Sequence, residues 1–392
     1  MTTSGTYAYA LSTADVVIEA FERLGLGVSE LQAEHMASAR RSLHLVLSSL
    51  WLNRGINLWR VDEVSVPLVA DSAAYNVDPA TVSVLDAFVR LYQLGAAADL
   101  TPGFATTNTS ATVTITKTAH GLAAKDWLRV VVPVAIGGLV IEGYYQVVSV
   151  TGDDAFTITA AGAATSTASG GAVPSYATTA ASATVTVTLA AHGHLAGQTF
   201  TVNVATAVGG ISLLGDYTIA SAPTADTLTI TAASAAGSTA SASENGGNTQ
   251  IASASNATAT DQALTPISRG QYANLASKTQ AGVPTQYWFE RLLAPRVTLW
   301  PIPDANGPYE FRYYRLRRLQ DAAIRADQEP DVPDRFTEAL CAQLAHHLSM
   351  KWRPDRVAEL LAWAKGTWDE ALNEDREKVA YQIDPDLSSY YR

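Results

Sequence analysis

An internal repeat constrains the fold of this chain more than any other feature of its sequence. The segment ATVTITKTAHG, which begins at Ala111, matches ATVTVTLAAHG, which begins 72 residues later at Ala183. Other matching positions keep the same spacing: His120-Gly121 with His192-Gly193, Gly137-Gly138 with Gly209-Gly210, Tyr145 with Tyr217, and Asp154 to Thr159 with Asp226 to Thr231. A constant spacing indicates a tandem duplication without insertions or deletions between the matched positions.

Each copy of the repeat has the pattern of a small β-domain. Thr and Val alternate along short runs, and Gly, Asp or Asn follows the runs. This alternation, with turn residues about every ten positions, is typical of an antiparallel sandwich or barrel. We therefore predict two all-β domains in series, residues 101–175 and residues 176–262. The Ala/Ser/Thr/Gly-rich stretches 160–171 and 232–248 are expected to be weakly structured connectors.

The composition of the chain changes at both ends of the repeats. No Lys or Arg occurs between Arg129 and Arg269, whereas residues 1–100 and 263–378 are charged, aromatic and punctuated by proline. We expect these two flanking parts to form one discontinuous α+β core, a helical bundle plus an antiparallel sheet. The two tandem all-β domains are then an insertion into that core, and residues 379–392 form an extended C-terminal tail.

The first flanking part predicts two helices followed by two strands. Ser12 begins a helix that Gly25 ends, and Ser29 to Gln32 reads as a capping box that opens a second helix reaching to about Asn53. Residues 59–69 and 81–94 alternate as strands.

The second flanking part contains the densest aromatic segment of the chain, GVPTQYWFERLLAPRVTLWPIPD, from Gly282 to Asp304. It predicts a hairpin with one strand at 287–289 and another at 297–300, and residues 309–314 form a third strand. We expect the hairpin to pair with the strand that ends near Leu94, across the inserted repeats. The residues expected to define this core hairpin are Pro284, Tyr287, Trp288, Phe289, Trp300, Pro301 and Pro303.

Two helices and the tail close the chain. Pro333 and Pro354 are placed as first-turn prolines, and apolar residues recur after each at helical spacing. The tail has little to stabilise it alone, and its aromatic and arginine side chains are typical of interface anchors. The expected docking residues are Tyr381, Ile383, Leu387, Tyr390, Tyr391 and Arg392.

The bulk composition excludes several classes of function. The formal net charge is −11, which disfavours a protein that grips nucleic acid through its phosphates, although an acidic channel that DNA slides through is compatible with it. Cys341 is the single cysteine, so no intrachain disulfide forms. The opening residues lack a secretory pattern and no long apolar run occurs, so we expect assembly in a reducing host cytoplasm and no membrane association.

No motif predicts catalysis, a cofactor or a metal. His120 and His192 recur with the repeat, but a lone His before Gly is more typical of turn chemistry than of a ligand. His346-His347 has no helical HExxH partner, and the acidic residues between Asp327 and Asp334 lack the glycine of a calcium loop. Arg40, Arg41 and His44 are too few for a basic patch. We expect no enzyme activity and no cofactor.

The ordered set of flanking segments resembles the head-to-tail adaptor proteins of short-tailed bacteriophages, also called tail tubular protein A or head-completion connectors. The segments are ARRSLHLVLSSLWLNRGINLW, VSVLDAFVR, the hairpin segment and LAHHLSMKWRPD, and the resemblance covers residues 1–98 and 263–392. The repeats lie outside it and are similar to modules found in phage tail proteins.

The resemblance implies a structural virion protein at the head–tail junction. In such proteins the copies form a ring, a dodecamer, that docks on the portal protein through its helical domain and its C-terminal tail. The hairpin region then faces the next tail component, the nozzle, or tail fibres, and DNA passes through during ejection without sequence-specific binding. Two alternatives stay open: a tail protein that binds host glycan through the repeats, and a tail-associated hydrolase.

Overall fold

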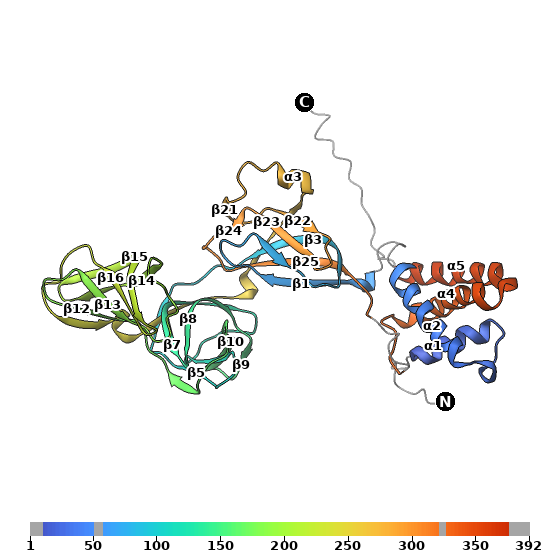
Figure 1. Ribbon diagram of the computed structural model, residues 1–392, viewed down its shortest axis with the longest axis horizontal. Helices are drawn as coiled ribbons and strands as arrows, with labels where there is room; N and C mark the ends of the chain where they lie inside the picture. The colour runs from blue at the N-terminus through green and yellow to red at the C-terminus, as the bar shows by residue number, and fades with distance from the viewer. Residues whose placement is uncertain (1–10, 51–57, 321–326, 376–392) are drawn as a thin grey trace, which may run out of the picture.

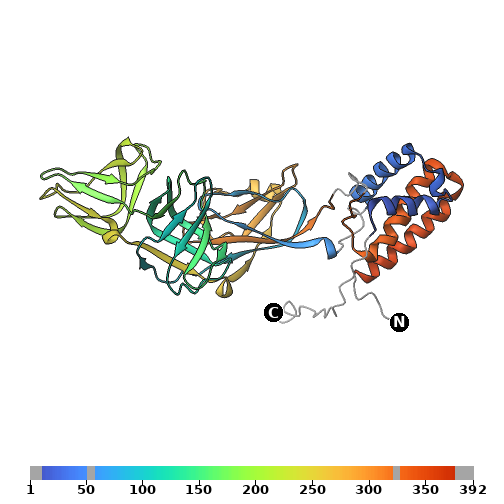
Figure 2. The same ribbon diagram turned by 90° about the horizontal axis from the view of Figure 1, so that it is seen from below.

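The computed structural model describes residues 11–50, 58–320 and 327–375. These residues form an elongated α+β molecule in which a helical bundle occupies one end and β-sheets occupy the rest (Figure 1). Figure 2 shows the same order along the long axis from a second direction.

The helical bundle joins the two ends of the sequence. It consists of α1 (Thr13–Arg23), α2 (Ala33–Leu45), α4 (Asp334–Trp352) and α5 (Val357–Glu374). Ser12 caps α1 as predicted, because its Oγ accepts from the Asp15 amide and the Asp15 carboxylate accepts from the Ser12 amide. Phe21, Leu43 and Phe336 are buried in one shared apolar core.

The predicted capping box at Ser29 is wrong. Residues Val28–Glu30 form a 3-10 turn in which the Glu30 carboxylate accepts from the Gly27 amide at 3.0 Å. The helix begins only at Ala33, where His35 Nδ1 accepts from the Gln32 amide at 3.0 Å. Gln32 is therefore the cap of α2. A π-helical turn, Val46–Leu50, follows α2, and the predicted end near Asn53 lies outside the described residues.

Two sheets packed face to face form a central sandwich. One sheet has the order β1 (Val61–Pro67), β25 (Tyr309–Arg317), β3 (Thr81–Leu91), β19 (Thr260–Ala263). The other has the order β2 (Ala74–Asn76), β23 (Arg296–Trp300), β22 (Gln286–Glu290), β20 (Thr265–Pro266). The short strands β21 (Ala281–Gly282) and β24 (Ile302–Pro303) pair beside the second sheet, and α3 (Arg269–Ala273) precedes them.

The predicted hairpin exists, but its predicted hydrogen-bonded partner is wrong. β22 and β23 pair antiparallel with Tyr287 opposite Leu299. β3 pairs instead with β25 along one side and, through Phe88 to Leu91, with β19 on the other. The outer edge of β23 pairs with β2 instead. The hairpin still shares a core with β3, since Tyr287 and Leu299 are buried in the same cluster as Val89.

Two small β-units form the far end of the molecule. The first β-unit comprises residues 98–173 and 249–254, and the second β-unit comprises residues 174–247. The first contains β4 (Ala98–Leu100), β5 (Phe104–Thr106), β6 (Thr112–Thr116), β7 (Trp127–Ile136), β8 (Leu139–Gln146), β9 (Ser149–Val150), β10 (Ala155–Thr159), β11 (Ala168–Gly170) and β18 (Thr249–Ala254). The second contains β12 (Ser175–Thr178), β13 (Thr184–Thr188), β14 (Thr199–Val208), β15 (Ile211–Thr224), β16 (Thr227–Thr231) and β17 (Ala240–Ser243).

The paths of the two units match strand by strand. The strands β6, β7, β8 and β10 begin 72 residues before β13, β14, β15 and β16 respectively. Buried Val and Ile alternate with outward Thr along β6 and β13, which explains the Thr/Val pattern of the sequence.

Three details differ from the sequence-based expectation. β18 does not belong to the second repeat, because it pairs with β7 and β4 of the first β-unit. β19 pairs with β3 of the central sandwich. The expected weakly structured connectors each contain a paired strand, β11 against β5 and β17 against β12. The second β-unit is thus nested within the first.

Candidate interaction sites

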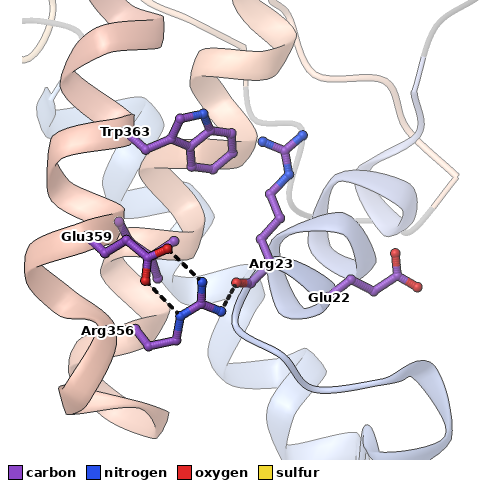
Figure 3. Close-up of a pocket in the computed structure, with 6 residues that line it drawn as sticks. Glu22, Arg23, Arg356, Glu359 and Trp363 are labelled. Carbon is purple, nitrogen blue, oxygen red and sulfur yellow. Dashed lines mark hydrogen bonds and ion pairs between the residues drawn. The ribbon is translucent and has the colours of Figure 1, made fainter.

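A pocket of about 420 Å³ opens between α1 and α5 at the bundle (Figure 3). Its lining residues come from the end of α1 and the start of α5: Glu22, Arg23, Arg356, Glu359, Leu360 and Trp363. The Arg23 guanidinium lies 4.0 Å from the centre of the Trp363 ring, a cation–π contact. Arg356 donates to the Arg23 carbonyl at 2.7 Å and to both carboxylate oxygens of Glu359.

These contacts fasten α1 to α5. The Arg356 side chain satisfies a carbonyl at the end of α1, where a helix leaves carbonyls without intrahelical donors and a cation is favoured. The cations of the pocket therefore already have partners within the bundle. The aromatic wall and the arginines of the pocket are residue types enriched at protein–protein contacts, whereas its glutamates are depleted there.

The core hairpin residues are mostly buried. Pro284, Tyr287, Pro301 and Pro303 are buried, and Phe289 packs against the sandwich core. The Trp288 ring lies 5.3 Å from that of Tyr272, and Trp300 Nε1 donates to the Ser277 carbonyl at 2.8 Å. Tyr287 and Phe289 thus belong to the sandwich core, whereas Trp288 and Trp300 contact the segment around α3.

The exposed part of the hairpin is its turn. Leu292 is 58% exposed and Leu293 is fully exposed, at the connection between β22 and β23. The sequence analysis missed these residues, although two adjacent leucines between strands that end in Glu290 and begin at Arg296 are a readable signal. They are a candidate contact for a partner.

The expected docking tail cannot be compared with the structure. Tyr381, Ile383, Leu387, Tyr390, Tyr391 and Arg392 lie outside the described residues. In the sequence the tail follows α5, the last helix of the bundle, which ends at Glu374.

The repeated histidines hold turns together. His120 Nδ1 accepts from the Leu122 amide at 3.0 Å, and its Nε2 lies 3.2 Å from the Gly152 carbonyl. His192 makes the same two contacts, with the His194 amide and the Thr224 carbonyl. Both ring nitrogens are therefore used within each turn, as the turn-chemistry interpretation expects. A pocket of about 300 Å³ lies beside His120.

The other sequence candidates have structural contacts. Asp331 of the acidic loop forms an ion pair with Arg317. Burial opposes it, but the hydrogen bonds from Arg317 and the Gln320 amide lower the pKa of Asp331. His346 and His347 lie edge to face within α4. Within residues 11–50, 58–320 and 327–375, no three His, Cys, Asp or Glu side chains are grouped as metal ligands.

A buried polar joint connects the central sandwich to the first β-unit. The Tyr92 hydroxyl donates to Glu310 Oε2 at 2.6 Å, and the Tyr92 ring lies 5.8 Å from that of Trp127. Burial and the Glu310 carboxylate together raise the pKa of Tyr92 to about 12. Arg312 pairs with the same carboxylate at 3.1 Å. The joint fixes Glu310, an acid within an aromatic strand that the sequence analysis did not single out.

A second joint connects the sandwich to the helical bundle. The fully buried Arg60 donates from Nε and from a terminal nitrogen to the Arg317 carbonyl, at 3.0 and 2.7 Å. Trp59 contacts Phe336 of α4 with ring centroids 5.9 Å apart. Together the two joints give the elongated molecule defined contacts at both ends of its central sandwich.

No helix in the described part of the chain is long and apolar enough to span a membrane.

Comparison with known proteins gives one family. Residues 199–386 match the family described as SU10 adaptor protein. The match begins at β14, so it includes part of the repeat region as well as the hairpin, β25 and the last two helices. No curated protein matches the chain.

Among solved structures, one of the matching chains is the phage phi92 endosialidase. It is 22% identical, the match covers 30% of this chain and 19% of that chain, and the TM-score is 0.18. This chain therefore spans about a fifth of that protein's length, and so low a TM-score carries no argument about fold or function.

The match to the SU10 adaptor protein family, over the C-terminal half that holds the hairpin and the closing helices, supports a phage adaptor-type protein, a structural component of the virion.

Proposed function

We propose that this protein is a ring-forming head-to-tail adaptor with a structural role and no enzyme activity. Its copies form a closed ring that docks on the portal protein, extends the DNA channel and carries the next tail component. The observation that carries the proposal is the adaptor-family match over residues 199–386. A ring of identical subunits requires two different, complementary surfaces on each copy.

The elongated shape supports a protein that contacts partners at separate places. The helical bundle forms one end, and the tail follows its last helix, α5, in the sequence. We assign portal docking to this end. The exposed Leu292 and Leu293 lie outside the bundle, in the turn of the hairpin on the central sandwich, and we assign them to the contact with the next tail component.

Co-sedimentation of the full chain with the portal protein tests the portal assignment. A variant that ends at residue 375 lacks the tail but keeps every described element of the bundle, and we expect it to lose most of its binding to the portal. A Leu292→Ser/Leu293→Ser variant serves as the matched control and should bind the portal normally. Equal portal binding by the truncated and full-length proteins contradicts the docking role of the tail.

The two β-units require a separate test, because a tail protein that binds host glycan through them is one of the alternatives that the sequence leaves open. The register pairs Leu91 with Thr260, so an Asn-Gly turn that replaces residues 93–258 joins β3 to β19 as a hairpin. If the shortened protein still assembles on the portal but the particles no longer adsorb to cells, the units bind the host. Loss of assembly makes them structural.

A further inference from the structure

The duplicated β-units differ in one respect that concerns binding. In the first β-unit, β7 lies between β8 and β18. In the second β-unit, the equivalent strand β14 pairs with β15 on one side and ends its sheet on the other, as far as the described residues show. The same edge is therefore occupied in one copy and open in the other.

The spacing of the repeat identifies the open positions. β18 pairs antiparallel with β7, with Ala252 opposite Arg129 and Ala254 opposite Trp127. Adding 72 residues places Thr201 at the position of Arg129 and Thr199 at the position of Trp127. The edge equivalent to the β18-binding edge is thus Thr199 to Val202.

Backbone hydrogen bonds show which groups of this edge point outward. The Ile219 amide donates to the Gln198 carbonyl at 2.8 Å, as the Val147 amide does to the Asp126 carbonyl in the first β-unit. In an antiparallel pair this bond makes Thr199 and Thr218 a non-hydrogen-bonded pair. The amide and carbonyl groups of Thr199 and Thr201 therefore point away from β15.

The open edge ends where the strand is bulged. The register of β14 against β15 shifts between Val202 and Thr206, and β7 is irregular at the equivalent place. In the second β-unit the buried Glu244 carboxylate accepts from the amides of Asn203 and Val204, at 2.9 and 3.1 Å. The Asn203 and Val204 amides are therefore already satisfied, whereas the Thr199 and Thr201 amides are not bound by Glu244.

Nothing in the edge sequence protects it against pairing. Thr199 to Val202 reads TFTV, without the proline or lysine that proteins place on edge strands. The bulge itself is no obstacle, because β18 binds β7 directly beside the equivalent irregularity.

We propose that the outer edge of β14, Thr199 to Val202, binds an extended uncharged segment of another protein as an added antiparallel strand. The bound segment has the character of Thr249–Ala254, TQIASA, in which small and β-branched side chains are buried. The occupant is a single strand rather than a second copy of β14, since two such edges share only four residues and are flanked by bulges. The inference is independent of the adaptor role.

A synthetic peptide of residues 247–256 tests this edge in the full-length protein. At about 1 mM peptide, we expect amide exchange of Thr199 and Thr201 to slow by at least about fivefold, with Phe200 unchanged. A photoreactive group at the Ala252 position of the peptide should crosslink at Thr201, which captures a weak complex and reports its register.

Two N-methylated peptides provide the matched control. In the first β-unit the Gly95 amide donates to the Ser253 carbonyl, so Ser253 faces away from β7 and Ala252 faces toward it. N-methylation at Ala252 should abolish the protection and the crosslink, and N-methylation at Ser253 should leave both unchanged.

Three results overturn the proposal. The first is an absence of both protection and crosslinking at β14 with the unmodified peptide. The second is equal sensitivity to the two N-methyl groups. The third is a dimer in which Thr199 and Thr201 are already protected without peptide, which assigns the edge to a second copy.

Discussion

At the scale of single residues, Glu244 shows how the two β-units diverged. Its fully buried carboxylate accepts from the Tyr176 hydroxyl at 2.6 Å and from the two amides of the β14 bulge. In the first β-unit the residue equivalent to Tyr176 is Phe104, and Thr249 of β18 lies against the bulge, its hydroxyl donating to the Val132 carbonyl. In the second β-unit a buried acid therefore binds the bulge of β14, whereas in the first β-unit the added strand β18 binds the bulge of β7.

Replacing Glu244 tests this role. Glu244→Ala leaves three buried donors without an acceptor, so we expect a loss of about 2–4 kcal/mol in the free energy of unfolding, measured by chemical denaturation. Glu244→Gln keeps the shape and an acceptor oxygen, and should cost about 1 kcal/mol. Asp153→Ala, at an exposed carboxylate, is the control. Equal effects of the two alanine variants contradict the role of Glu244.

The pH dependence of stability carries a second residue-scale prediction. Burial raises the pKa of Glu244, although the hydrogen bonds to its carboxylate oppose this. Folding therefore favours the protonated form of Glu244. The contribution of this protonation to the free energy of unfolding is fully present below the ordinary glutamate pKa. It is lost as the pH rises from that value through the raised pKa of the folded state.

Denaturation of the wild type and of Glu244→Gln across this pH window isolates the effect. The wild type should lose stability relative to Glu244→Gln as the pH rises, because glutamine does not ionise. Parallel stability curves for the two proteins contradict the raised pKa.

At the scale of elements, the joint between the central sandwich and the first β-unit depends on Tyr92. Tyr92→Phe keeps the ring against Trp127 but removes the hydroxyl that donates to Glu310. We expect a loss of about 1–2 kcal/mol in the free energy of unfolding, because a buried carboxylate loses one of its donors. Tyr314→Phe, at a ring that is 39% exposed on β25, is the matched control and should have little effect. Similar losses for both variants contradict the joint.

The sequence predicted elements where local pattern decides the structure. Ser12 and Asp15 specify the start of α1, and the alternation of Thr and Val specifies β6 and β13. The prediction from sequence failed where strands distant in the chain decide which strands pair. Nothing local at β18 shows that it pairs with β7 more than a hundred residues earlier, because its small residues suit either unit.

The candidate sites show the same limit. The sequence analysis assigned the hairpin residues to the core, and Tyr287 and the prolines are buried there, but it overlooked the exposed leucines of the turn. The contact of Arg23 with Trp363 joins residues from opposite ends of the sequence, so no spacing within the sequence indicates it.

At the scale of the whole molecule, the β-units are nested insertions rather than parts of the central sandwich. The shortened protein with an Asn-Gly turn between Tyr92 and Ala259 should therefore fold, because β3 keeps both of its neighbours, β25 and β19. We expect cooperative thermal unfolding and a helical circular dichroism signal from the intact bundle. A shortened protein that is soluble but lacks cooperative unfolding contradicts the nested arrangement.

The central claim is the adaptor role, and electron microscopy of the full-length protein mixed with the portal protein tests it most directly. The account predicts closed rings of this protein seated on one face of the portal, with the helical bundles toward the portal and the β-units away from it. Portal particles that stay bare at saturating concentrations of a folded, monomeric protein would contradict it.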